Sequence, residues 1–194
     1  AIGVDVSGGV GKDYSVITVM SKMTSSPVAV WRSNVTEPVR LAEQIIDIGT
    51  DYNRALVLVE SNNFGNVVLN QLRHDGYANL WKQDGKDWQT TLKSKTEMFE
   101  KLKRDLQTGR IRHIDKLTHD ELRSITVSER GHIELGRDDG AHSDSAVALA
   151  LTNVCLDKVK LAERHILPDW IRKRKIDKVV QEWGARISQS RRYE

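Results

Sequence analysis

Three carboxylates stand beside apolar segments that lie far apart in the sequence. Asp5 is inside the first apolar run, Glu60 ends the apolar run 55–59, and Asp144 opens a long apolar stretch. A carboxylate in a hydrophobic element costs free energy unless a cation compensates its charge. Carboxylates are preferred ligands of Mg²⁺ and Mn²⁺, and two such ions can promote hydrolysis of a phosphodiester. If the three segments converge, the acids predict a metal-dependent enzyme.

Each acid also has a plainer interpretation when it is taken alone. Asp5 is compatible with an edge strand that faces solvent, and Glu60 with a simple strand end. Asp144 or its neighbour Ser143 would cap a helix and oppose its dipole favourably. Only the combination of the three acids favours an enzyme over a module without catalytic activity.

The glycine-rich segment 7–12 invites comparison with a phosphate-binding loop, and it fails the test. The loop motif needs a glycine where this chain has Val6, and a serine or threonine where it has Asp13. The segment also leads into a β-rich stretch, whereas the phosphate-binding loop leads into a helix. We therefore predict a turn here, with Lys12 and Asp13 close to any site at Asp5.

The hydrophobic pattern along the chain predicts strands that alternate with helices. The wholly apolar run 55–59 is typical of a central strand that is buried on both faces. In chain order the predicted strands span 1–6, 14–20, 28–33, 55–59 and 77–81, with 111–114 as a further candidate. The predicted helices span 37–48, 64–74, 95–107, 119–122 and 143–161, and residues 124–135 predict a β-hairpin. This order predicts an α/β fold whose mixed five-stranded sheet, three antiparallel strands and then parallel strands, is flanked by helices and carries an extra hairpin.

The composition is typical of one globular domain followed by a basic segment. The chain has 194 residues, of which 39% are hydrophobic and 29% charged, and its formal net charge is +3. Residues 163–194 hold nine Lys and Arg against five Asp and Glu, whereas residues 1–162 hold 21 against 22. We therefore predict a folded domain over 1–162 and a basic helical tail over 163–194.

The cysteine content, the apolar runs and the N-terminus exclude several classes of protein and of site. The single cysteine, Cys155, excludes an internal disulfide bond and a cysteine-based zinc site. No apolar run approaches the length of a membrane span, and the N-terminus has no signal-peptide pattern. The chain starts at Ala1 and enters a strand at once, so we expect it to be part of a longer protein.

Taken with their neighbours, the three acids lie in segments that resemble the nuclease domain of tailed-phage terminase large subunits. Residues 3–17 are similar to the opening of that domain, and residues 59–65 match its E-x-N-x-x-G segment. Residues 95–96 head a helix that resembles its threonine–lysine stretch, and residues 106–114 resemble its L-x-x-G-x-I-x-I stretch. The pattern E-L…G…E…G-x-H-D-D-x-x-x-A of the family is similar to Glu121, Leu122, Gly131, Glu134, Gly140, His142 and Asp144. The resemblance runs in order across residues 2–160.

The resemblance implies an RNase H-like fold of the kind shared by RuvC resolvases and integrases. It implies a nuclease that cuts double-stranded DNA concatemers during viral genome packaging, with two Mg²⁺ or Mn²⁺ ions and little sequence preference. Asp5, Glu60 and Asp144 match the three metal ligands of the family. The family often has two adjacent acids before the last helix, and this chain has Ser143 in place of the first. That departure makes His142 the candidate auxiliary ligand or proton carrier.

The same resemblance implies the partners and the location of the protein. Basic side chains would contact DNA phosphates, and the candidates are Lys12, Lys93, Lys95 and Arg130. The hairpin 124–135 would gate or grip the DNA, or else only extend the sheet. The protein partners would be a terminase ATPase domain, the portal protein and the small terminase subunit. We expect the ATPase domain to be absent from this chain, since no segment fits the phosphate-binding loop. The location would be the host-cell cytoplasm, without attachment to a membrane.

Two other functions are compatible with the sequence. One is a docking or DNA-binding module of a packaging motor that has no catalytic activity, which the missing acid at Ser143 favours. The other is an ATPase lobe of the actin and sugar-kinase type, whose related fold opens with a similar strand and glycine-rich turn. Against it, 194 residues supply one lobe where two are needed to enclose ATP. Binding of Mn²⁺ through Asp5 separates a nuclease from a docking module.

Overall fold

The computed structural model describes residues 1–62, 64–129, 131–135 and 142–160. The predicted basic tail 163–194 lies outside these residues. The strands are β1 (Ile2–Asp5), β2 (Ser15–Ser21), β3 (Ser26–Ser33), β4 (Val57–Val59), β5 (Thr126–Val127) and β6 (Ile133–Glu134). The helices are α1 (Pro38–Asp51), α2 (Gly65–His74), α3 (Leu92–Gln107), α4 (Lys116–Arg123) and α5 (Asp144–Lys158).

The main sheet has the strand order β3-β2-β1-β4. The pairs β1–β2 and β2–β3 are antiparallel, and β1–β4 is parallel. The predicted mixed sheet, in which three antiparallel strands precede the parallel pairing, is therefore confirmed, but among the described residues it has four strands with one parallel pair in place of five strands with several parallel ones. The wholly apolar run that predicted a buried strand forms β4, and Val57, Leu58 and Val59 are each at most 2% exposed.

The predicted fifth strand at 77–81 is reduced to a single parallel bridge between Val57 and Leu80. Val57 donates its N–H to the Asn79 carbonyl, and Trp81 donates its N–H to the Val57 carbonyl. The chain then turns away through Asp84 and the glycine after it, both at positive φ. The other candidate, 111–114, forms no strand, because His113 has a φ of 58° that extended pairing does not allow.

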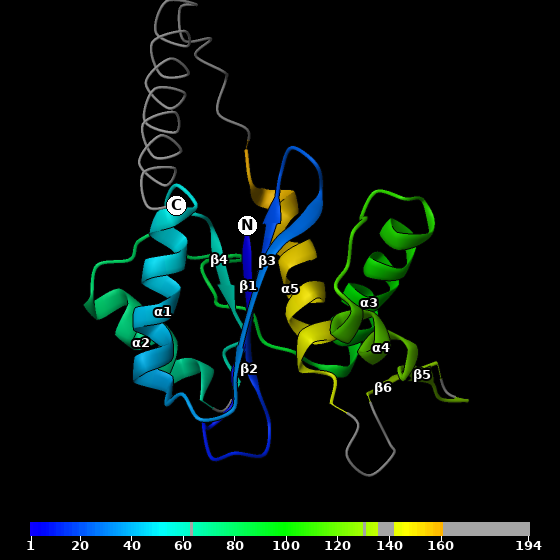
Figure 1. The fold of residues 1–194 in the computed structure, drawn as a ribbon, viewed down its shortest axis with the longest axis horizontal. Coiled ribbons are helices and arrows are strands. Elements are labelled where there is room, and N and C mark those ends of the chain that lie inside the picture. The colour runs from blue at the N-terminus through cyan, green and yellow to red at the C-terminus, as the bar shows by residue number, and fades with distance from the viewer. Residues whose placement is uncertain (63, 130, 136–141, 161–194) are drawn as a thin grey trace, which may run out of the picture. The chain divides into compact units, whose positions relative to one another are not determined.

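Helices cover both faces of the main sheet (Figure 1). One hydrophobic cluster joins α1 and α2 to the sheet face that carries Ile2 and Val4. A second cluster joins α5 and α3 to the opposite face, which carries Met20 and Leu58. Because side chains alternate between the two faces of a strand, Gly3 and Asp5 share the α5 face of β1. The same alternation directs Glu60, two positions after Leu58, to the α5 face.

Helix α3 begins three residues before the predicted start at residue 95. Thr91 accepts a hydrogen bond from the Ser94 N–H at 3.2 Å, and Ser94 Oγ accepts one from the Thr91 N–H at 2.8 Å. This reciprocal capping satisfies two backbone donors that would otherwise lack partners in the first turn. A polar cap of this kind lies outside the apolar pattern, which is why the hydrophobic spacing placed the start too late.

The predicted extra hairpin is present as the separate two-stranded sheet of β5 and β6, which pair in antiparallel fashion. In the described residues it is not an extension of the main sheet. Arg130, predicted to contact DNA from this hairpin, lies outside the described residues. No described helix has the length and apolar character needed to cross a membrane.

We expect Gly3→Ala to destabilise the fold strongly. A Cβ atom at this position would lie 2.3 Å from the Thr152 nitrogen and 2.7 Å from the Ala148 carbonyl oxygen. Both are backbone atoms of α5, so relief requires movement of the whole helix, at a cost of about 3 kcal/mol in the free energy of unfolding. Urea unfolding measures this cost, with the exposed β3 substitution Val28→Ala as a control expected to cost less than about 1 kcal/mol. A Gly3→Ala midpoint equal to that of the unchanged chain would contradict the close contact.

Candidate active site

Asp5 and Glu60 meet at the ends of two neighbouring parallel strands. Val4 of β1 pairs with Val59 of β4, and the Glu60 N–H donates to the Val4 carbonyl at 3.3 Å. The carboxyl ends of parallel strands lie at the same edge of a sheet, so the next residue of each strand projects at that edge. Both acids line one cavity of about 130 Å³, together with Val6 and Asn62.

Asp144 reaches the same end of the sheet from the start of α5. Positions 144, 148 and 152 follow the i, i+4 spacing of one helix face. Atoms of Ala148 and Thr152 are the nearest neighbours that a Cβ added at Gly3 would meet, so this helix face lies against β1. Asp144 Oδ2 accepts a hydrogen bond from the Tyr14 N–H at 3.0 Å, just before β2 begins. Two segments that are 130 residues apart are thereby joined beside the candidate site.

Two of the three acids, Asp5 and Asp144, have raised pKa values, as expected where carboxylates are partly buried close to one another. Burial raises the pKa of the Asp5 carboxyl well above its ordinary value of 3.8, and the nearby charges of Glu60 and Asp144 raise it further. Burial also raises the pKa of Asp144, while the Tyr14 N–H and His142 partly oppose the shift. A cation bound among these groups would favour their ionised forms, because opposite charges lower the pKa of a carboxyl.

The side chains, as they stand, are not closed around an ion. Among the residues described, no group of three or more His, Cys, Asp and Glu side chains is arranged to hold a metal ion. Glu60 Oε1 accepts a hydrogen bond from Asn62 Nδ2 at 2.7 Å, and Asp144 is hydrogen-bonded to the Tyr14 amide. The donor set nevertheless fits a hard divalent ion, since its atoms are carboxylate oxygens. A cavity of about 130 Å³ also has room for an ion with several waters, each of which occupies about 30 Å³.

Two neighbours of the acids had no assigned role in the sequence analysis. Asn62 donates both to Glu60 and, at 3.2 Å, to the Thr90 carbonyl, so it fixes the direction of the Glu60 carboxylate. The E-x-N spacing was visible in the sequence, and it is the signal that could have identified Asn62. Glu121 is 6% exposed and forms an ion pair with Arg32 at 3.3 Å. Glu121 matches the glutamate that opens the family's E-L pattern, and this match is the signal that could have identified it.

The other predicted site residues lie in different settings. His142 Nδ1 is 3.6 Å from Asp144 Oδ2, and its ring packs edge-on against Tyr14 with centroids 5.2 Å apart. Lys12 is exposed in the turn before β2. Lys93 is exposed in the first turn of α3, 3.9 Å from a carboxylate oxygen of its helix neighbour Glu97, and Lys95 is half-buried on the same helix. The roles of these residues in DNA or metal binding stay predictions.

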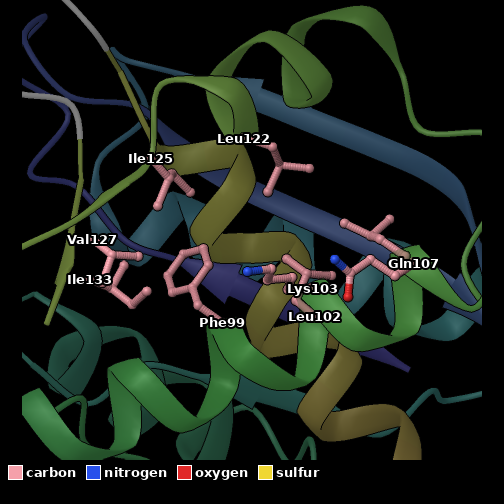
Figure 2. Close-up of a pocket in the computed structure, with 9 residues that line it drawn as sticks. Phe99, Leu102, Lys103, Gln107, Leu122, Ile125, Val127 and Ile133 are labelled. Carbon is pink, nitrogen blue, oxygen red and sulfur yellow. The ribbon is translucent and has the colours of Figure 1, made fainter. Parts of the chain in front are cut away.

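A larger and mainly apolar cavity, of about 380 Å³, lies away from the acids. It is lined by α3, the end of α4 and the hairpin, through Phe99, Leu102, Lys103, Leu106, Gln107, Leu122, Ile125, Val127 and Ile133. Figure 2 shows the α3 side chains Phe99 and Leu102 facing this space from one side, with Leu122 and Ile125 across from them. None of the lining residues is an acid or a histidine, so we place the candidate chemistry at the smaller cavity.

Comparisons with known proteins identify the family. A family model described as "Terminase RNaseH-like domain" matches residues 2–153. The solved large terminase nuclease from thermophilic phage G20c with bound magnesium has a TM-score of 0.65 and 22% identity, covering 82% of this chain and 81% of that chain. The same nuclease with bound cobalt has a TM-score of 0.66 and 21% identity, over the same shares of the two chains.

A second solved protein gives the same result. The large terminase nuclease domain of Thermus phage P74-26 has a TM-score of 0.62 and 23% identity, covering 78% of this chain and 76% of that chain. No curated protein sequence matches this chain. At these identities the solved structures show a shared fold, and the family model extends over most of the chain. The chain therefore belongs to the terminase RNaseH-like domain family.

Proposed function

We propose that this chain is the metal-dependent endonuclease domain that cuts double-stranded DNA concatemers during viral genome packaging. The observation that carries the proposal is the gathering of Asp5, Glu60 and Asp144 at one end of the sheet, where burial and then the charges of the other two acids raise the pKa of Asp5. Membership of the family supports a role in DNA cutting. The magnesium and cobalt in the similar G20c nuclease support a divalent ion as the cofactor.

Asp5, Glu60 and Asp144 would hold two Mg²⁺ or Mn²⁺ ions, with Asp5 shared because it interacts with both other acids. Bound there, the ions would supply activation of a water molecule and stabilisation of the departing 3′-oxygen. Asn62 orients Glu60, and the Tyr14 amide orients Asp144. We assign to His142, beside Asp144, the role of auxiliary ligand or proton carrier.

DNA would be held mainly through its phosphates. Lys12, Lys93, Lys95 and Arg130 are the assigned contacts, and binding through phosphates carries little sequence preference and weakens steeply with salt. We further assign residues 1–162 to the nuclease domain and 163–194 to a basic tail. The partners would be a terminase ATPase domain, the portal protein and the small terminase subunit, in the host-cell cytoplasm.

Plasmid cleavage tests the proposal directly. Supercoiled plasmid is incubated with the purified chain in Mg²⁺, Mn²⁺ or EDTA, beside Glu60→Gln, Asp144→Asn and the control Asp47→Asn, an exposed acid on α1. We expect metal-dependent nicking and linearisation that falls at least about 100-fold in the two site variants, since loss of even an outer partner of a metal ligand costs about 10–100-fold. The control should cut like the unchanged chain.

Two results would count against the proposal. Cutting that survives in both site variants would mean that the active site lies elsewhere. No cutting by the unchanged chain, at high protein concentration and low salt, would favour the docking module that has no catalytic activity.

A further inference from the structure

Glu121 caps a helix to which it does not belong. Its Oε2 accepts hydrogen bonds from the Ser145 N–H at 2.7 Å and the Ala146 N–H at 3.0 Å. Its Oε1 accepts one from Ser145 Oγ at 3.1 Å. The first N–H groups of a helix have no partner within the helix, and a side chain at the N-cap usually satisfies them. In α5 the N-cap residue Ser143 makes no such bond, and the carboxylate from α4 takes its place.

This arrangement decides where Asp144 can point. An aspartate in the first turn of a helix is attracted to the free N–H groups of that turn. Here Glu121 already occupies the N–H groups of the next two residues, and the Asp144 carboxylate accepts from the Tyr14 amide instead. The capping glutamate therefore leaves Asp144 directed toward the end of the sheet where Asp5 lies.

Arg32 completes the connection from the other side. Its Nη1 lies 3.3 Å from Glu121 Oε1, and its guanidinium carbon lies 3.8 Å from the centroid of the Tyr14 ring. The same cation thus contacts the capping carboxylate and the residue whose amide holds Asp144. The side chains of Arg32 and Glu121 are 17% and 5% exposed, so little solvent competes with the pair.

We propose that Glu121 is a positioning residue, which sets the direction of the Asp144 carboxylate and through it the affinity of the site for divalent ions. The second part rests on the proposed function, in which Asp144 holds such an ion. Glu121 itself touches no reacting group in this assignment. Its effect is exerted through the N-terminus of α5 and through Arg32.

The backbone amide of Tyr14 tests, without any metal, whether Glu121 sets the direction of the Asp144 carboxylate. In Glu121→Ala, the freed N–H groups of α5 should attract Asp144, and the Tyr14 amide resonance should shift as its hydrogen bond is lost. Leu122→Ala is the matched control, because it truncates the adjacent residue of α4, which faces the apolar cavity. Both variants are measured by ¹⁵N NMR in the metal-free protein. A Tyr14 resonance unchanged in Glu121→Ala, or shifted equally in Leu122→Ala, would overturn the proposal.

Titration with Mn²⁺, followed by calorimetry, tests the second part. We expect Glu121→Ala to weaken binding about 10–100-fold, in the range seen for lost outer partners of metal ligands. Glu121→Gln keeps an oxygen that can accept the α5 N–H groups, so it should recover most of the affinity. In Glu121→Ala combined with Asp144→Asn, binding should equal that of Asp144→Asn alone, since both changes act through one carboxylate.

Additive losses in the double variant would overturn the positioning role toward the metal. If the unchanged chain binds no Mn²⁺, the proposed function fails. The Tyr14 resonance then still decides whether Glu121 directs Asp144.

Discussion

Replacing Asp5 by asparagine is expected to abolish DNA cutting and, at the same time, to stabilise the metal-free domain. The activity should fall at least about 100-fold, because the shared ligand of the proposed ions loses its charge. The stability should rise because the ionised Asp5 is half-buried and lies near Glu60 and Asp144, and its burial and these two charges raise its pKa. The asparagine side chain has a similar shape and brings no charge into this position.

The expected pH dependence follows from the direction of the same pKa. The folded protein holds the Asp5 proton at pH values where the unfolded chain, with a pKa near 3.8, has lost it. The free energy of unfolding therefore falls as the pH rises from 3.8 through the raised pKa of the folded state. Above that range the Asp5→Asn variant should be more stable than the unchanged chain and should melt at a higher temperature. Below 3.8 the Asp5 contribution to this difference should vanish.

Thermal melting with and without Mn²⁺ separates the two effects. An ion that binds only the folded state raises the melting temperature. Mn²⁺ should therefore stabilise the unchanged chain and leave Asp5→Asn almost unaffected. The control Asp47→Asn should melt like the unchanged chain in EDTA, and Mn²⁺ should stabilise it as much as the unchanged chain. If Asp5→Asn melted lower than the unchanged chain in EDTA, the acid would be a structural group and not one held at a cost for ion binding.

Gly65→Ala should inactivate the domain although Gly65 carries no functional group. A Cβ at this position would lie 1.6 Å from the Glu60 carbonyl oxygen and 2.8 Å from its carbonyl carbon. These backbone atoms can separate only if the start of α2 or the Glu60 segment moves by more than 1 Å, as ordinary contacts are near 3.5 Å. The Gly65 N–H also donates to the Asn62 carbonyl, so the displacement would reach Glu60 and Asn62, two of the four residues that line the cavity.

A misplacement of about 1 Å at a catalytic group can cost about 100-fold in rate. We therefore expect plasmid cutting and Mn²⁺ affinity to fall together in Gly65→Ala, with the helical circular dichroism spectrum retained. Asn66→Ala, at the next and exposed position of α2, is the control and should change neither. Full cutting by Gly65→Ala would show that the segment around Glu60 adapts freely, or that Glu60 is no ligand.

This contact also gives a physical reason for Gly65, which the sequence analysis could only match to the last position of a family segment. Gly65, the glycine of the E-x-N-x-x-G segment, is the first residue of α2. It lies against the carbonyl of Glu60, which opens the segment. Its φ is not in the left-handed region, so steric contact is the reason for glycine here and backbone freedom is not. The close approach of Gly65 to the Glu60 carbonyl therefore helps to hold Glu60 at the end of β4.

The sequence by itself predicted most of the local elements, and it named the three acids as candidate metal ligands. Strand β4 follows from its wholly apolar run and α5 from its long apolar stretch, since burial on each face is written into local periodicity. Glu60 could be assigned to a strand end for the same reason, whereas Asp5 was predicted inside a strand 1–6 and is in fact the last residue of β1. The fifth strand at 77–81 failed because a short run can match the strand pattern although only Leu80 finds a pairing partner.

Only the tertiary structure decided how the acids are held. The Tyr14–Asp144 bond joins residues 130 apart, and Glu121 caps α5 from a helix 24 residues earlier. Such contacts depend on how α4, α5 and β3 pack and on the directions of their side chains, and no local pattern encodes either. The sequence thus identifies the groups that could bind an ion, while the packing of separate elements sets the charges around those groups and the directions of their side chains.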